Sequence, residues 1–182
     1  IECRRVVLTA GTFLGGLMHC GTNSAEGGRA GDEASHGITE QLVSLGFESG
    51  RMKTGTPARL DARTINFDAL EVQEGDIEPS KFSYDADTQV VKYQLPCFMV
   101  YTSKAVHDIL REGFDRSPLF NGTISGIGPR YCPSIEDKLR TFADKEQHQL
   151  FLEPEGRSTN EYYLNGFSSS LPYDVQLEAL RK

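Results

Sequence analysis

Cys132 is the residue whose neighbours best suit chemistry. It stands in the run GPRYCPSIEDK at 128–138, between two prolines and two residues after Arg130. Ser134 lies three residues before Asp137, a spacing that predicts an N-cap and the start of a helix. A helix start carries about half a positive charge, and a guanidinium adds a full one. Both favour thiolate over thiol, so we expect a nucleophilic or acid–base cysteine, although a buried, inert cysteine fits the spacing equally well.

A helix and a strand are expected to hold this run in place. Ile135, Leu139 and Phe142 repeat at the spacing of one helix face, which predicts an amphipathic helix after Ser134. Residues 123–128 alternate in polarity and predict a short strand leading directly into the cysteine turn. A reactive group between a strand and a helix is held rigidly.

Composition excludes several classes of protein. The chain has 182 residues and four scattered cysteines, with no C-x-x-C pair and no histidine at zinc-ligand spacing, so we expect neither a metal site nor a secreted disulfide framework. No apolar run approaches the roughly 20 residues that span a bilayer. The net charge of −7 argues against indiscriminate nucleic-acid binding. It leaves room for a local basic face at either of two clusters, although such clusters are usually just solvated. The clusters are Arg51, Lys53, Arg59 and Arg63, and Lys138, Arg140 and Lys145.

The other elements predict a mixed α/β chain without repeats. Apolar or β-branched runs predict strands at 5–9, 90–102 and 149–152. Asn165-Gly166, between two apolar runs, predicts a hairpin, and Pro96 suggests an edge strand or a bulge.

Helices are predicted where apolar residues recur at helical spacing between start and stop signals. The expected helices lie between Ser35 and Gly46, between Ser103 and Gly113, and from Pro172 onward. Residues 15–37 are glycine-rich, and residues 71–89 are acidic and lack periodicity, so we expect irregular loops there.

Four motifs in order resemble those of one enzyme family. They are GGRAGD at 27–32, KTGTP at 53–57, the run at 128–138 and FLEPEG at 151–156. The set resembles the GidA/MnmG family of FAD-dependent tRNA uridine 5-carboxymethylaminomethyl modification enzymes. The likeness covers essentially the whole chain, and the 128–138 string is highly specific.

The resemblance implies an α/β fold of mixed α+β character. Residues 1–50 would be the C-terminal part of an FAD-binding Rossmann-type domain, 51–150 an inserted mixed or antiparallel-sheet domain for substrate and NADH, and 151–182 the return segment. No G-x-G-x-x-G follows a strand, so we expect the dinucleotide fingerprint upstream in a longer protein. By itself this piece is expected to be inactive.

The resemblance also implies site residues. FAD would contact Ser35, with Gly28 and Arg29 in the adjoining loop, and Cys132 would be the catalytic thiol. The basic residues Lys53, Arg59 and Arg63 are candidates for tRNA contacts, and no metal site is implied. The positions implied for NAD are Gly128, Pro129, Arg130, Tyr131, Cys132, Pro133, Ser134, Ile135, Glu136, Asp137, Lys138, Leu139, Arg140, Thr141 and Phe142.

The implied activity installs a carboxymethylaminomethyl or aminomethyl group at C5 of the wobble uridine of certain tRNAs. FAD, NADH and a folate one-carbon unit would take part, in complex with the GTPase MnmE. The full protein would be a homodimer in the bacterial cytoplasm, with no membrane association. Two alternatives stay open: a TrmFO-type methyltransferase, which uses folate and FAD to methylate a tRNA uridine at C5, and a module that only binds tRNA or the GTPase.

Overall fold

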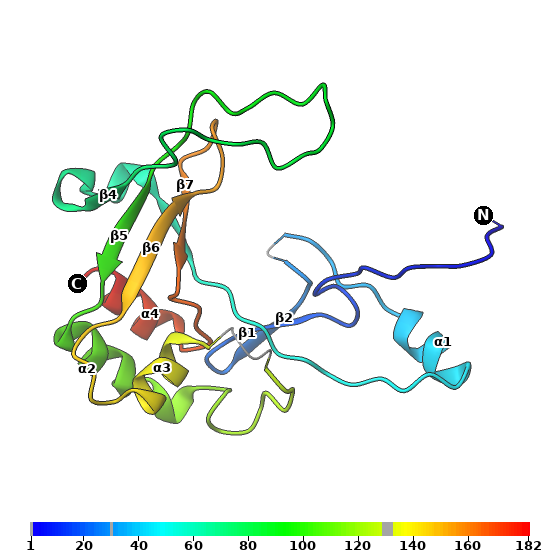
Figure 1. Cartoon of the computed structure of the whole chain (residues 1–182). Helices are drawn as coiled ribbons and strands as arrows, with labels where there is room; N and C mark the ends of the chain where they lie inside the picture. Colours follow the sequence, from blue (N-terminus) through cyan, green and yellow to red (C-terminus); the bar gives the residue numbers. More distant parts are fainter. Residues whose placement is uncertain (1, 30, 129–132) are drawn as a thin grey trace.

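The computed structural model describes residues 2–29, 31–128 and 133–182. Figure 1 shows two unlike parts: a sheet with helices packed against it, and an extended N-terminal portion that projects from it. A long irregular loop, residues 74–96, arches beyond the sheet. The confirmed fold class is mixed α+β with antiparallel sheets.

The main sheet has five antiparallel strands in the order β3-β7-β6-β5-β4. Its strands are β3 (Arg59–Asp61), β4 (Glu71–Gln73), β5 (Cys97–Tyr101), β6 (Gln149–Pro154) and β7 (Glu161–Asn165). The sheet takes strands from both sides of the expected division at residue 150, and that division stays a prediction.

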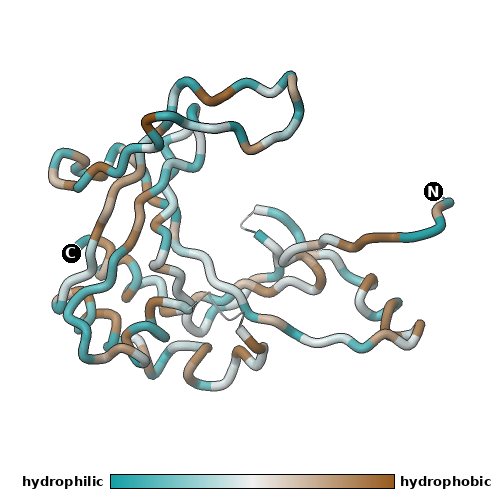
Figure 2. The backbone as a smooth tube through the Cα atoms, in the orientation of Figure 1, coloured by the Kyte–Doolittle hydropathy of each residue, from teal (hydrophilic) through white to brown (hydrophobic). Residues whose placement is uncertain are grey.

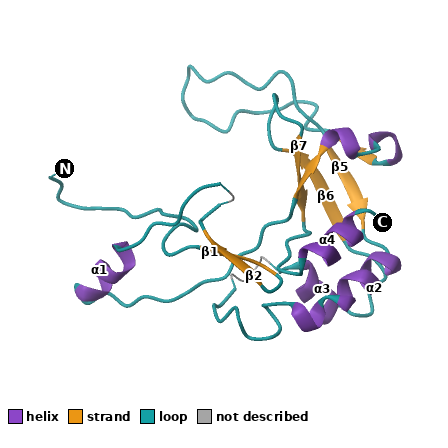
Figure 3. Ribbon diagram, turned by 180° about the vertical axis from the view of Figure 1, so that it is seen from behind, coloured by secondary structure: helices purple, strands orange, loops and turns teal. Residues whose placement is uncertain are grey.

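Three helices pack on one face of this sheet: α2 (Lys104–Glu112), α3 (Ile135–Thr141) and α4 (Tyr173–Leu180), as Figure 3 shows. Side chains alternate along a strand, so Leu150 and Leu152 of β6 enter the core with Leu164 of β7. The helices contribute Val106, Leu110, Ile135, Leu139, Val175 and Ala179 to the same cluster. Short 3₁₀ turns, η1 (Ala62–Thr64), η2 (Phe67–Ala69) and η3 (Phe114–Arg116), complete this part.

The predicted helix starts are confirmed at atomic detail. The Ser103 hydroxyl accepts a hydrogen bond from the Val106 amide at 3.3 Å, and Ser134 accepts one from the Asp137 amide at 3.2 Å. These side chains satisfy N–H groups that a helix start leaves unpaired. The predicted helix before Gly46 is α1 (Ile38–Ser44), which ends where Gly46 turns to φ 91°.

The predicted strand at 5–9 is wrong. Val6 and Val7 are 78% and 85% exposed and belong to no ladder, because the described residues place no strand beside them. Figure 2 shows this stretch as a hydrophobic segment of the projecting N-terminal tail. Among the described residues of this part, the strands that pair are β1 (Leu17–Cys20) and β2 (Asn23–Glu26), which form a hairpin. The glycine content of the segment concealed this hairpin at the level of sequence.

Three further predictions are corrected. Residues 123–128 form no strand; Ile127 makes only a single bridge to Met52. Asn165-Gly166 is not a hairpin turn, since Gly166 at φ 94° ends β7 and the hairpin partner of β7 is β6. Pro96 precedes β5, which lies inside the sheet rather than at its edge.

Across the described residues, every helix is too short or too polar to span a bilayer.

Candidate functional site

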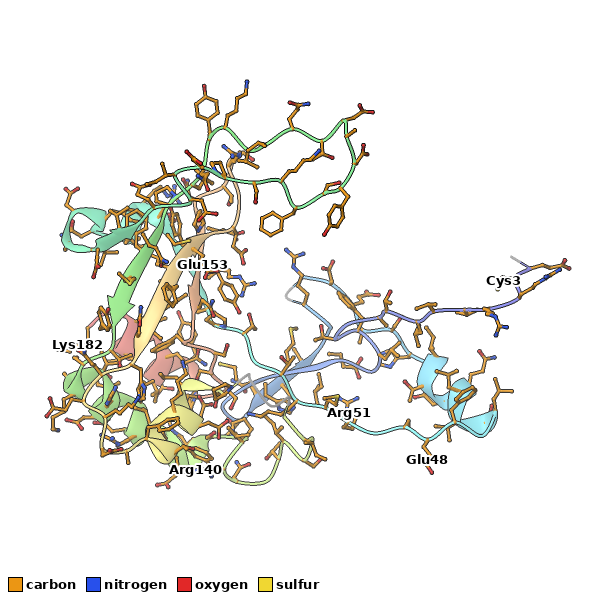
Figure 4. All side chains as sticks on the ribbon, in the orientation of Figure 1. Cys3, Glu48, Arg51, Arg140, Glu153 and Lys182 are labelled. Atoms are coloured by element: carbon orange, nitrogen blue, oxygen red, sulfur yellow. The ribbon has the colours of Figure 1, made fainter. Side chains whose placement is uncertain are left out.

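The candidate site lies where segment 53–57, the start of α3 and segment 168–172 meet. Pro129, Arg130, Tyr131 and Cys132 lie outside the described residues, so the site is built from the residues that flank them. Figure 4 draws the side chains on the ribbon and labels Arg51, two residues before segment 53–57, and Arg140, in α3.

Lys53 contacts both flanks. Its amide donates to the Ile127 carbonyl at 3.1 Å, and its ammonium donates to Asp137 Oδ2 at 3.0 Å. The two side chains are only 17% and 20% exposed. Burial raises the pKa of Asp137, but hydrogen bonds and charge from Lys53, with hydrogen bonds from Ser134, outweigh it and hold that pKa below its usual value.

Glu136 anchors the first turn of α3 from inside. Its side chain is fully buried, and Oε1 accepts hydrogen bonds from the Ser170 amide at 2.8 Å and the Ser170 hydroxyl at 2.9 Å. The Ile135 amide donates to the Ser168 carbonyl at 2.7 Å. Oε2 has no hydrogen-bond partner within the described part of the chain. The helix start is therefore fixed to the segment that follows β7.

The same segment also binds the N-terminal hairpin. The Gly21 amide donates to the Ser170 carbonyl at 2.7 Å, and a Cβ at Gly21 would lie 2.9 Å from Pro172 Cα. Segment 53–57 approaches from another side, since a Cβ at Gly55 would lie 2.9 Å from Ser168 Cβ. Glycine is required at both positions because real side chains do not pack this closely.

The residues implied for FAD converge on one turn. The Ser35 amide donates to the Phe13 carbonyl at 2.8 Å, and Gly28 packs on the Phe13 ring, where a Cβ would lie 2.4 Å from Cδ1. Arg29, in the loop after β2, is exposed, and its backbone forms an isolated β-bridge with Asp32. An exposed guanidinium beside a glycine loop is a donor set that fits a cofactor phosphate.

The three basic residues expected to contact tRNA do not form one patch. Lys53 is engaged with Asp137, as described above, whereas Arg63 is 75% exposed and pairs with Asp61. Arg59 donates to Glu155 Oε1 at 2.6 Å. The Arg59 guanidinium also lies 4.6 Å above the centre of the Tyr163 ring.

Two shallow hollows lie on the sheet face opposite the helices. One, of about 630 Å³, is lined by Arg29, Arg59, Glu153, Pro154, Glu155 and Tyr163. The other, of about 380 Å³, lies near β4 and β5 and shares Glu153, which Figure 4 labels. The larger hollow brings a residue implied for FAD beside one expected to contact tRNA.

The remaining positions implied for NAD serve different parts of the structure. Ile135 and Leu139 are 0% and 2% exposed and pack in the core. The Lys138 ammonium donates to the Gly166 carbonyl at 2.8 Å, and Arg140 lies 4.5 Å above the centre of the Phe120 ring. Phe142 ends the helix half-exposed.

Sequence reasoning missed the anchoring role of the serine run 168–170 and the burial of Glu136. An acidic residue beside an N-cap usually faces solvent, so only the distant contact between Glu136 and Ser170 reveals its role. Nowhere in the described ranges do three or more His, Cys, Asp or Glu side chains gather as a metal site would require.

Comparisons with known proteins agree along the whole chain. The profile of the family "Glucose inhibited division protein A" matches residues 1–182. Enzymes named "tRNA uridine 5-carboxymethylaminomethyl modification enzyme MnmG" are 60% identical in Cytophaga hutchinsonii and 61% in Flavobacterium psychrophilum; each alignment covers 100% of this chain and 29% of the relative.

A solved structure has the same fold. GidA from Aquifex aeolicus superposes with a TM-score of 0.83 at 49% identity, over 95% of this chain and 30% of that one. The chain spans about 29% of the length of the curated relatives it matches. On this evidence the chain belongs to the glucose-inhibited division protein A family.

Proposed function

We propose that the protein containing this chain modifies C5 of the wobble uridine in tRNA, installing a carboxymethylaminomethyl or aminomethyl group. The observation that carries the proposal is the 60% identity, over all 182 residues, to an enzyme named for that reaction. Residues 1–50 would belong to a flavin-binding domain, and the rest would supply the reactive segment and its support.

Gly28, Arg29 and Ser35 would hold FAD. Arg29 would face a phosphate, while the turn at Phe13 fixes the loop that carries it. When bound, the flavin supplies reducing equivalents that NADH renews. Residues 128–142 would bind NADH; because Ile135 and Leu139 pack in the core, the contacts in that run would come from its other members.

Cys132 would activate the uracil ring. Its thiolate would form a bond to C6, and the C5–C6 π electrons would move toward O4, which makes C5 nucleophilic toward a one-carbon electrophile from a folate. Loss of the C5 proton would expel the folate amine and leave an exocyclic methylene at C5. The amine of glycine or ammonium would add to that carbon, and the returning electrons would expel the thiolate from C6. The alternative role is acid–base exchange of that same proton.

The tRNA would contact Arg59 and Arg63 on the sheet, with a contribution from Lys53 open to test. Arg63 is the most exposed of these side chains and is paired only with an exposed carboxylate. A GTPase of the MnmE type, a second copy of the protein and a cytoplasmic location complete the proposal.

The test is a Cys132→Ser exchange in the full-length protein, with Cys97→Ser as the matched control. Modified wobble uridine should disappear from the nucleosides of tRNA in the first variant and persist in the second, while both retain flavin absorbance. A fully active Cys132→Ser enzyme would remove the thiol from the proposal. A C5-methyl uridine product would identify a TrmFO-type methyltransferase instead.

NADH binding has a separate test. An Arg130→Gln enzyme should bind NADH several-fold more weakly, because Arg130 lies within the segment proposed to hold the dinucleotide and a lost ionic contact weakens binding about tenfold. Unchanged NADH affinity would argue for another site.

A further inference from the structure

We propose that Lys53 is a positioning residue that holds the two flanks of segment 129–132 at a fixed separation. The inference rests on the proposed function to the extent that Cys132, inside that segment, is the reacting residue. It assigns to Lys53 a role other than contact with tRNA.

The first flank is held by the backbone and the aliphatic stem of Lys53. The Lys53 amide donates to the Ile127 carbonyl at 3.1 Å, and the backbones of Met52 and Ile127 form an isolated β-bridge. A Cβ at Gly126 would lie 3.0 Å from the Lys53 nitrogen, and one at Gly128 would lie 2.8 Å from Lys53 Cε. The chain therefore enters segment 129–132 in direct contact with this lysine.

The second flank is held by the ammonium group. Lys53 Nζ donates to Asp137 Oδ2 at 3.0 Å, and the Ser134 hydroxyl donates to the same oxygen at 3.1 Å. The Asp137 amide donates back to Ser134 at 3.2 Å. Through Asp137, the ammonium group of Lys53 is therefore linked to Ser134, the N-cap residue of α3.

Charge and burial argue against a phosphate contact. The Lys53 side chain is 17% exposed and already neutralised by Asp137, whereas Arg63 is 75% exposed. A phosphate would have to displace a partly buried ion pair to reach Lys53, and such a displacement has a desolvation cost. Holding both flanks requires no such exchange.

The test uses the full-length flavoenzyme with Lys53→Met, Lys53→Arg and Asp137→Asn variants, and Arg63→Met as the matched exposed control. Three quantities are measured: tRNA affinity against salt concentration, the single-turnover rate of uridine modification, and the pH profile of Cys132 alkylation by iodoacetamide, read by peptide mass spectrometry. Flavin content and thermal unfolding report whether each variant folds.

Lys53→Met should leave tRNA affinity within about twofold and its salt slope unchanged. It should slow modification about tenfold or more, because a small displacement of a reacting group is costly, and should shift the alkylation profile. Lys53→Arg should recover part of the rate, since a guanidinium can also donate to Asp137. Asp137→Asn should reproduce the rate and alkylation effects even if Lys53→Met does not fold.

The opposite pattern would overturn the inference: a salt slope lowered by about one, weaker tRNA binding and an unchanged alkylation profile in Lys53→Met, which are the marks of a phosphate contact. Failure of the proposed function is distinguishable. If wild-type enzyme makes no modified uridine while the Lys53 variants still shift Cys132 alkylation, the positioning role stands and the reaction assignment fails.

Discussion

The two parts of the chain differ in what they bury. From residue 59 onward, leucines of the sheet and helices form one core with Leu110 and Leu171 fully enclosed. Between residues 2 and 52, the buried residues that the structure describes are all glycines: Gly16, Gly21 and Gly27. The part from residue 59 onward supplies its own packing partners, whereas residues 2–52 leave large apolar side chains such as Val6, Val7 and Leu45 exposed. The candidate site lies where the two parts join.

Core truncation should separate the two parts most strongly. Leu110→Ala should lower the free energy of unfolding of the 182-residue chain by about 2–5 kcal/mol, because it leaves a cavity. Val7→Ala, at an exposed position, should change it by no more than about 0.5 kcal/mol. Urea unfolding followed by circular dichroism measures both. Equal losses would mean that residues 2–52 bury their apolar side chains after all.

The anchor of α3 should rank second. Glu136→Ala leaves the amide and hydroxyl of Ser170 without their acceptor in a buried place, which should cost about 1–3 kcal/mol of unfolding free energy. Glu178→Ala, on the exposed side of α4, is the control and should be nearly neutral. Thermal unfolding measures the stability of both variants. An unchanged stability in Glu136→Ala would show that the contact to Ser170 does not stabilise the junction.

A pair of buried histidines should make the core sensitive to acid. The rings of His107 and His148 lie 5.3 Å apart. The Thr102 hydroxyl pairs with His107 Nε2 at 2.7 Å and accepts a hydrogen bond from the His148 backbone amide at 2.8 Å. Burial is the main cause that lowers the pKa of both rings. Positive charge from His148 and Arg111 also lowers the pKa of His107, and positive charge from Lys138 and Lys145 also lowers that of His148.

The sign of the effect follows from those lowered pKa values. The unfolded chain takes up protons first as the pH falls below about 6.5, so stability is full above that pH and is lost below it. Hydrogen exchange of α2 and β6 amides in the full-length protein, corrected for intrinsic rates, should show a lower opening free energy at pH 5.5 than at 7.5. His148→Gln should flatten this dependence and the exposed control His36→Gln should not; a dependence unaffected by His148→Gln would exclude the pair as its cause.

The smallest effect concerns the exposed pair on β3. Hydrogen bonds from the Arg63 side chain and amide lower the pKa of Asp61 to about 2. Arg63→Gln should raise that pKa toward 3.8 while hardly changing stability, because exposed pairs contribute little. Any stabilisation by Asp61 is present above about pH 4 and is lost as the pH falls toward 2. Carboxyl carbon shifts in an NMR titration follow it, and an unmoved midpoint would show that Arg63 is not responsible.

Predictions from local sequence patterns were correct where the contacts that stabilise the element are also local. The caps Ser103 and Ser134, the stop at Gly46 and the apolar run of β6 are confirmed, because each depends on residues within one turn or on the core beside it. The strand expected at 5–9 failed for the opposite reason: its apolar pattern requires neighbouring strands that the described residues do not provide.

The site was less predictable than the fold. Lys53 and Asp137 are 84 residues apart in sequence, and Glu136 and Ser170 are 34 apart, so no local pattern announces either contact. The three basic residues expected to contact tRNA lie in different surroundings. Lys53 belongs to a partly buried ion pair with Asp137, whereas the Arg59 and Arg63 side chains are more exposed. The reactivity of Cys132 stays a prediction.

The most direct measurement is the pH dependence of alkylation at every cysteine of the full-length protein, resolved peptide by peptide. Burial, with the nearby carboxylates Asp174 and Glu153, raises the pKa of Cys20 and Cys97, so both should react only at high pH. Cys132, which in the sequence follows Arg130 by two residues and precedes the N-cap Ser134 by two, should become reactive well below the value of about 8.5 expected for a free thiol. A Cys132 midpoint at or above those of Cys20 and Cys97 would contradict the reactive thiolate on which the proposed function depends.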